Sequence, residues 1–278
     1  MTVADSSAAV ALERRSSTAW ITLERPEAMN AFDPALIFQL SAAVREAADD
    51  PSVRVLVITG SGRAFSAGAD LKAISSPDGD VDADAMLAFV AEAAAMIETV
   101  AAVGKPVIAA VNGLALAGGL ELALACDLII ASDRALLGDA HSNFGLLPGA
   151  GGSVRLTRRI GASAAKRLMY SGDSAPAPDL VVCGLVDEVV PADLLESKVE
   201  DLAAQFAAKS PPGLAAMKRL VDHASDSSLA DALEAEQREL ARHAHSPDLA
   251  EGLAAFRAKR APVFGSASSS SNPTMESK

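Results

Sequence analysis

The sequence VIAAVNGLALAGGLEL, residues 107–122, passes from an apolar run through glycines into a helix-forming stretch. Residues 107–111 predict a buried strand, and residues 120–125 predict a helix. An earlier segment, VLVITGSGRAFSAGADL at 55–71, likewise places a small-residue turn after an apolar run. Two turns of this kind indicate an α/β core whose strands pair mostly in parallel.

Runs on either side extend this pattern. Residues 19–23 alternate apolar and small polar side chains like a strand, and residues 53–59 and 127–131 are further strand candidates. Asp33 followed by Pro34 has the composition of an N-cap and a first helical turn, so a helix is expected from there to about residue 49. The order of strand, helix and strand supports the α/β assignment.

The pattern changes near residue 192, after which it is only helical. Helices are expected at 192–208, 212–223, 228–245 and 248–259. The chain is therefore divided into a mobile N-terminus at 1–12, an α/β core at 13–191, a helical region at 192–264 and a disordered Ser-rich tail at 265–278.

Composition excludes several classes of function. The 278 residues carry 24 Lys and Arg against 36 Asp and Glu, a net charge of −12, which argues against a nucleic-acid-binding protein. No apolar run is long enough for a membrane helix, and the N-terminus does not resemble a secretory signal. Cys126 and Cys183 are too few for a disulfide framework or a zinc site, so free thiols, a cytoplasmic location and no bound metal are expected.

The turns at 66–70 and 117–119 have two interpretations. Small residues let a ligand approach the backbone, and two N–H groups aimed at one oxygen form an oxyanion hole. Such turns after buried strands also serve tight packing alone. Neither turn matches a dinucleotide-binding or phosphate-binding glycine motif.

Several blocks in order resemble the enoyl-CoA hydratase/isomerase, or crotonase, family. They are ITLERPEAMNAF at 21–32, AFSAGADLKAI at 64–74, KPVIAAVNGLALAGGLELALACDLIIAS at 105–132, FGLLPGAGGSVRLTRRIG at 144–161, GDSAPAPDLVVCGLVDEVVP at 172–191 and EGLAAFRAKRAPVF at 251–264. The resemblance implies a spiral of β-β-α turns followed by a helical region that forms trimers, commonly stacked into hexamers. It implies acyl-CoA thioester substrates, with no cofactor other than the coenzyme A that the substrate carries.

The resemblance also implies roles for single residues. The thioester oxygen would be held by the backbone N–H groups of Ala69 and Gly118, and Glu121 would activate water as the first of two catalytic glutamates. Segments that contact substrate or coenzyme A in the family contain Arg25, Ala28, Ala67, Asp70, Leu71, Lys72, Phe256 and Lys259, the last two from a neighbouring subunit.

The chain departs from the family pattern in the segment LGDAHSNFGLLPGAGG at 137–152. The family has proline and the second catalytic glutamate where this sequence has Ala140 and His141. His141 could replace that acid, since an imidazole titrates near neutral pH, or it could simply be packed. Asp139 could orient His141, act as the second carboxylate, or be a loop residue, and Ser142 and Asn143 could hold a water molecule or a polar group of the substrate.

The leading hypothesis is hydration of 2-enoyl-CoA to 3-hydroxyacyl-CoA through a thioester enolate. An alternative keeps the oxyanion hole and uses Glu121 with His141 for isomerisation, decarboxylation, C–C cleavage or thioester hydrolysis. A second alternative is an acyl-CoA-binding protein without catalysis. A buried acid such as Glu121 argues against this last possibility, because a carboxylate in apolar surroundings is unfavourable without a partner or a function.

Overall fold

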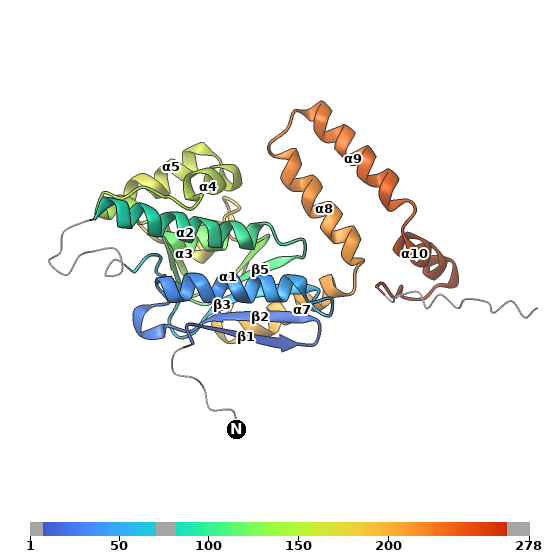
Figure 1. Ribbon diagram of the computed structural model, residues 1–278, viewed down its shortest axis with the longest axis horizontal. Coiled ribbons are helices and arrows are strands. Elements are labelled where there is room, and N and C mark those ends of the chain that lie inside the picture. Colours follow the sequence, from blue (N-terminus) through green and yellow to red (C-terminus); the bar gives the residue numbers. More distant parts are fainter. Residues whose placement is uncertain (1–7, 71–81, 266–278) are drawn as a thin grey trace, which may run out of the picture. The chain divides into compact units, whose positions relative to one another are not determined.

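The computed structural model describes residues 8–70 and 82–265 (Figure 1). The chain divides into two compact units, one up to Ala207 and one from Ala208 onward. The first unit contains the sheets and the second is helical. Among the helices of the described ranges, none has the length and apolar character needed to cross a lipid bilayer.

The larger sheet has six strands within the described residues, in the order β1-β2-β3-β5-β7-β10. Neighbouring strands are parallel except for the antiparallel pair β1 and β2. The strands are β1 (Val10–Arg15), β2 (Thr18–Leu23), β3 (Val55–Gly60), β5 (Val107–Val111), β7 (Leu128–Ser132) and β10 (Glu188–Val190). The parallel core matches the prediction from the apolar runs.

Both faces of this sheet are buried. Along β3, Leu56 and Ile58 belong to one apolar cluster, whereas Val55 and Val57 belong to another. This alternation follows from the two-residue period of a strand. The first cluster includes residues of helices α1 (Pro34–Asp49) and α2 (Ala83–Ala101), and the second includes residues of α7 (Leu195–Ala207).

The chain also forms a second, smaller sheet. Its order is β4 (Ala64–Ser66), β6 (Leu114–Leu116), β8 (Leu136–Gly138) and β9 (Ala175–Pro176). Each of β3, β5 and β7 is followed in sequence by one of the first three short strands, and β6 leads straight into helix α3 (Gly118–Leu124). This repeated order is the predicted spiral of β-β-α turns.

The remaining helices surround these sheets or form the second unit. In the first unit they are α4 (Gly152–Ile160), α5 (Ala162–Ser171), α6 (Ala177–Val181) and the short 3₁₀ turns η1 (Pro26–Ala28), η3 (His141–Phe144) and η4 (Ala192–Leu194); in the second they are α8 (Pro211–Ala224), α9 (Leu229–His243) and α10 (Pro247–Ala258). Five of the longer helices of the described residues begin with a capping side chain that accepts a backbone N–H of the first turn; these side chains are Asp33, Asp82, Ser210, Ser228 and Ser246.

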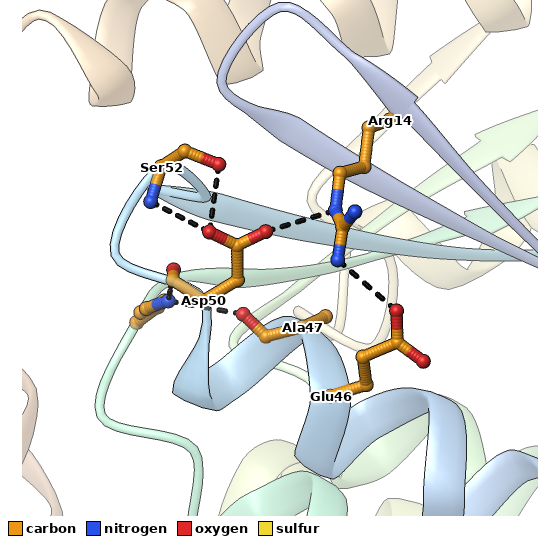
Figure 2. A network of polar contacts seen from close by, with 6 residues as sticks. Arg14, Glu46, Ala47, Asp50 and Ser52 are labelled. Atoms are coloured by element: carbon orange, nitrogen blue, oxygen red, sulfur yellow. Dashed lines mark hydrogen bonds and ion pairs between the residues drawn. The ribbon is translucent and has the colours of Figure 1, made fainter.

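The C-terminal end of α1 is fixed by charged groups (Figure 2). Asp50 accepts hydrogen bonds from the Ser52 backbone and hydroxyl, and it pairs with Arg14 of β1, which also contacts Glu46. Lys105 donates to the carbonyl oxygens of Ala47 and Asp50. A positive charge at this end opposes the negative end of the helix dipole.

Two boundaries predicted from the sequence are wrong. Residues 10–12, assigned to a mobile terminus, belong to β1 and pair with β2. The helix at 192–208 was assigned to the C-terminal helical region, but the second unit begins only at Ala208, because Leu195 and Val199 of α7 are buried against the sheet. Residues 1–7 and 266–278 of the two predicted mobile termini lie outside the described residues.

Asn30 joins three segments of the first unit. Its side chain is fully buried, accepts from the Arg25 backbone N–H at 2.9 Å, and donates to the Ser61 and Ala64 carbonyl oxygens at 3.0 and 2.8 Å. Its φ of 54° is a left-handed conformation, which asparagine adopts more readily than most residues. The carbonyl of Asn30 accepts from the Ser66 hydroxyl at 2.8 Å, next to the first glycine turn.

We predict that Asn30→Ala lowers the free energy of unfolding by about 2 to 4 kcal/mol, because buried backbone groups lose their partners. Urea denaturation followed by circular dichroism measures the change. Gln205→Ala on α7 is the control, since it removes an exposed amide. A loss for Asn30→Ala no larger than that of the control would contradict the assignment.

Candidate active site

The first unit encloses a cavity of about 1150 Å³. Its wall combines residues of η1, the first glycine turn, α2, the turn into α3 and the segment at 140–150. The predicted site residues that line it are Arg25, Ala28, Ala67, Ala69, Asp70, Gly118, Glu121 and His141. Leu71 and Lys72 lie outside the described residues, and Phe256 and Lys259 belong to the second unit.

The two glycine turns meet at the cavity. A Cβ atom on Gly68 would lie 2.9 Å from the Gly118 nitrogen, and one on Gly119 would lie 2.1 Å from the Ser66 carbonyl oxygen. Real side chains do not fit at such distances, so the approach of the two backbones requires glycine. The short parallel pairing of β4 with β6 brings the turns together.

The N–H groups of Ala69 and Gly118 have no protein acceptor within residues 8–70 and 82–265. Phe32 pairs with this segment by donating to the Gly68 carbonyl at 2.7 Å and accepting from the Asp70 N–H at 2.8 Å, which leaves the Ala69 N–H between them unused. Gly118 is the first residue of α3, where a backbone N–H has no partner inside the helix. Both residues line the cavity.

The residue that begins α3 is strained. Ala117 has φ 48° and ψ −118°, a conformation that residues with a Cβ rarely adopt. Strain of this kind amounts to about 1 to 3 kcal/mol and persists only where the surrounding structure imposes it. Here it sets the orientation of the peptide group that carries the Gly118 N–H.

Glu121 projects from α3 and is only 3% exposed. Its Oε1 accepts the backbone N–H groups of Ala150 at 2.9 Å and Gly152 at 2.8 Å. No group in the described part of the chain donates to Oε2. Burial raises the pKa of Glu121, although the two N–H donors and the charge of His141 act in the opposite direction. A carboxylate with a raised pKa is a stronger base than an exposed one.

His141 lies beside Asp139 at the same cavity. Its Nδ1 is 3.2 Å from the Asp139 Oδ2, which is an ion-pair distance without the alignment of a hydrogen bond. Burial alone would lower the pKa of His141, but the carboxylates of Asp139 and Glu121 outweigh it and raise that pKa above its usual value. Asp139 itself is buried.

The backbone before His141 is incompatible with proline. Ala140 has φ 58°, whereas a proline ring fixes φ near −65°. The segment therefore has a different course from one that contains proline at this position.

Ser142 and Asn143 are not among the residues that line the cavity. Asn143 instead donates to the Gly172 carbonyl at 2.7 Å. Neither residue supports the suggested contact with substrate.

Arg25 has more internal partners than a phosphate-binding residue needs. It pairs with Asp33 at 3.1 Å and Asp70 at 3.2 Å, and it donates to the Ala31 carbonyl. Its charge is thus balanced by carboxylates of the protein. Within the part of the chain that the structure describes, no group of three or more His, Cys, Asp or Glu side chains could hold a metal ion.

Sequence reasoning missed two components of the site. The N–H donors of Ala150 and Gly152 carry no side-chain signal, and only the glycines at 151 and 152 hint at a close backbone approach. The apolar wall also carries no recognisable motif, and α2 supplies part of it, including Phe89, Val90 and Ile97. The segment at 144–150 forms another part.

Comparison with known proteins agrees with this geometry. Residues 13–267 match the family model described as enoyl-CoA hydratase/isomerase. A probable enoyl-CoA hydratase of Mycobacterium bovis is 40% identical over 255 residues, 92% of this chain and 97% of that protein. A 2,3-dehydroadipyl-CoA hydratase of Escherichia coli is 37% identical, with 91% and 97% covered.

Solved structures give the same result. The 1.8 Å crystal structure of an enoyl-CoA hydratase from Bacillus anthracis superimposes with a TM-score of 0.88 at 34% identity, covering 92% of this chain and 99% of that one. The fold, the paired glycine turns and the extent of these matches lead to one conclusion. The chain belongs to the enoyl-CoA hydratase/isomerase family.

Proposed function

We propose that the protein adds water to 2-enoyl-CoA thioesters and forms 3-hydroxyacyl-CoA. One observation carries the proposal: two N–H groups without protein acceptors, on Ala69 and Gly118, share a cavity with the buried carboxylate of Glu121. The names of the mycobacterial and Escherichia coli relatives, both hydratases, support it.

The N–H pair would hold the thioester oxygen. Addition of hydroxide at the β-carbon moves negative charge onto that oxygen as an enolate. Donors already fixed by the backbone stabilise this charge without reorganising, and loss of one such donor typically raises the barrier by about 3 to 4 kcal/mol. The close approach of the two backbones at Gly68 and Gly119 would keep the two turns in place during this step.

Glu121 would take a proton from the attacking water. Its Oε1 is fixed by Ala150 and Gly152, so its Oε2 is the oxygen available to the water molecule. His141 would donate a proton to the α-carbon, and Asp139 would favour the protonated ring. One proton is taken from water and one is given to carbon, so the net number of protons on the protein does not change.

Coenzyme A binding is proposed for the remaining predicted residues. Lys72 and Leu71 would follow directly after the oxyanion-hole turn, and Ala28 and Ala67 line the cavity. Phe256 and Lys259 would contact the nucleotide part of a coenzyme A molecule that is bound to a neighbouring subunit. No further cofactor is proposed, and the two cysteines, both free thiols, support a location in the reducing cytoplasm.

A second candidate function follows from the substitution at 141. With one carboxylate, Glu121, and an imidazole in place of the second, the site could carry out isomerisation, decarboxylation, C–C cleavage or thioester hydrolysis. Each of these also passes negative charge to a thioester oxygen, so the oxyanion hole serves them equally. The family includes isomerases as well as hydratases, as its description states.

A homotrimer, or a hexamer of two trimers, is proposed for the assembly. Several large apolar side chains are exposed in the second unit, among them Met217, Val221, Leu229, Leu233 and Leu240. On α9 they recur at helical spacing and form one apolar stripe. Exposed apolar stripes of this kind favour contact with another subunit.

We predict that Glu121→Gln lowers kcat for hydration of 2-enoyl-CoA by about 10²- to 10⁴-fold, the usual contribution of a general base. The glutamine carbonyl can still accept from Ala150 and Gly152, so the fold should survive. Loss of absorbance of the conjugated thioester measures the rate, and Glu92→Gln on the exposed side of α2 is the control.

Unchanged turnover in Glu121→Gln would refute the role of Glu121. Mass spectrometry of a panel of acyl-CoA thioesters covers the other possibilities. Conversion of a different thioester identifies one of the alternative reactions, and tight binding without any conversion supports the binding protein.

We predict a bell-shaped dependence of kcat/KM on pH. Activity falls on the acid side as Glu121 gains a proton, and it falls on the alkaline side as His141, whose pKa is raised, loses one. His141→Gln should abolish the alkaline limb and reduce kcat on the order of 10²-fold. Steady-state rates from acid to alkaline pH test this, with the exposed His245→Gln as control.

The variant His141→Glu separates hydration from the alternatives. It introduces the acid of the family pattern but places a carboxylate beside buried Asp139, so no gain in hydration is expected. A large gain would mean that the native site is adapted to another reaction.

An alkaline limb that persists in His141→Gln would exclude His141 as the proton donor.

We predict a particle mass in solution of three or six times the 28.3 kDa chain mass. Light scattering after gel filtration measures it. Leu233→Glu, which places a charge in the apolar stripe of α9, should lower the mass, while Glu236→Ala on the same helix should not. A monomer for the unaltered chain would contradict the proposed assembly.

A further inference from the structure

Arg155 of α4 is bound to the loop that holds Glu121. Its Nη1 donates to the Ala150 carbonyl at 3.0 Å, and Ala150 is one of the two residues whose N–H groups bind the Glu121 carboxylate. The side chain of Arg155 is only 20% exposed, although it carries a permanent charge. Arg155 is not among the residues that line the cavity.

The two glycines of this loop accommodate Arg155 and Glu121 separately. A Cβ on Gly151 would lie 2.1 Å from the Arg155 Nη1, and a Cβ on Gly152 would lie 2.9 Å from the Glu121 Oε1. The guanidinium thus packs against the Gly151 backbone, whose φ of 100° is open to glycine. One side of the loop contacts the cation and the other contacts the carboxylate.

Arg155 also connects the loop to the wall of the cavity. Its Nη2 pairs with Glu98 of α2, the helix that supplies Phe89, Val90 and Ile97 to the wall. The Glu98 side chain is 67% exposed, and ion pairs with so much solvent contribute little. The contact with the Ala150 carbonyl is therefore the one expected to matter for Glu121.

We propose that Arg155 is a positioning residue for Glu121. By holding the Ala150 carbonyl, Arg155 fixes the loop at 150–152 and, with it, the two N–H groups that bind the Glu121 carboxylate. The proposal rests on the proposed function only for the role of Glu121 as the base. Arg155 touches neither substrate nor reacting atoms. Its effect passes through the backbone at 150–152.

The protonation of Glu121 reports on this arrangement. The N–H bonds from Ala150 and Gly152 favour the ionised carboxylate and so lower its pKa against the effect of burial. His141, which also lowers it, and Asp139, which raises it, are the charged groups that act on Glu121 from the neighbouring loop. Without Arg155 the loop loosens, the N–H bonds weaken, and the carboxylate keeps its proton to higher pH.

The test compares Arg155→Met, Arg155→Lys, Arg159→Met and Glu98→Gln in the full chain. Arg159 is the matched control, because it lies one helical turn further on and binds the Gly184 and Leu185 carbonyls and Asp187 instead. Infrared difference titration measures protonation of Glu121 directly, through the carboxylic acid band that disappears in Glu121→Gln. Steady-state kinetics on 2-enoyl-CoA supplies kcat and KM.

In Arg155→Met we expect kcat to fall by about 10- to 100-fold, with KM little changed, as for a misplaced catalytic group. The infrared titration midpoint and the acid limb of the rate profile should both move to higher pH. Arg155→Lys can still donate one hydrogen bond to Ala150 and should recover part of the loss. Glu98→Gln and Arg159→Met should titrate like the unaltered protein.

An unchanged titration midpoint in Arg155→Met would overturn the proposal. If that variant does not fold, Arg155→Lys decides the matter, because a midpoint equal to that of Arg159→Met contradicts the role. The infrared measurement needs no substrate, so it tests the positioning role of Arg155 independently of the proposed hydratase function. A shifted midpoint in a protein that does not hydrate enoyl-CoA removes the proposed function and leaves the role of Arg155 standing.

Discussion

The contact between two backbones, at Gly68 and Gly118, is the constraint on which the site depends. The two turns come from different strand-to-helix connections, and they can approach this closely only because Gly68 and Gly119 carry no Cβ atom. β3 and β5 run in parallel, which brings their carboxyl ends to the same edge, and the short strands β4 and β6 continue the pairing. Once the turns touch, the Ala69 and Gly118 N–H groups and the start of α3, with Glu121, are fixed together.

Much of this could be predicted from side chains that carry a local signal. The strand at 107–111 is wholly apolar and buried, and Asp33 caps α1 as its position before Pro34 indicates. β1 was missed because its sequence, VALERR, does not alternate between apolar and polar residues; it is an edge strand that is only partly buried. β4, β6 and β8 have three residues each, too few for any periodicity, and they form only because pairing with neighbouring strands holds them.

In the site, too, residues with a distinctive side chain could be predicted from the sequence, whereas contacts made by the backbone could not. Glu121 was identified because an acid in an apolar helix is conspicuous, whereas its partners are main-chain N–H groups that any residue could supply. Arg25 was assigned to coenzyme A binding from the family resemblance, whereas the folded chain pairs it with Asp33 and Asp70, and the pair with Asp70 joins residues 45 positions apart. Electrostatic roles of this type depend on tertiary neighbours, so a single sequence does not reveal them.

The left-handed backbone at Ala140 limits which amino acids position 140 can hold. A proline cannot enter this position while φ is 58°, because its ring fixes φ near −65°. His141 is not among the residues with positive φ, so a carboxylate at 141 meets no such restriction from its own backbone. The dihedral angle at residue 140 thus separates two replacements that the sequence alone presents as one change.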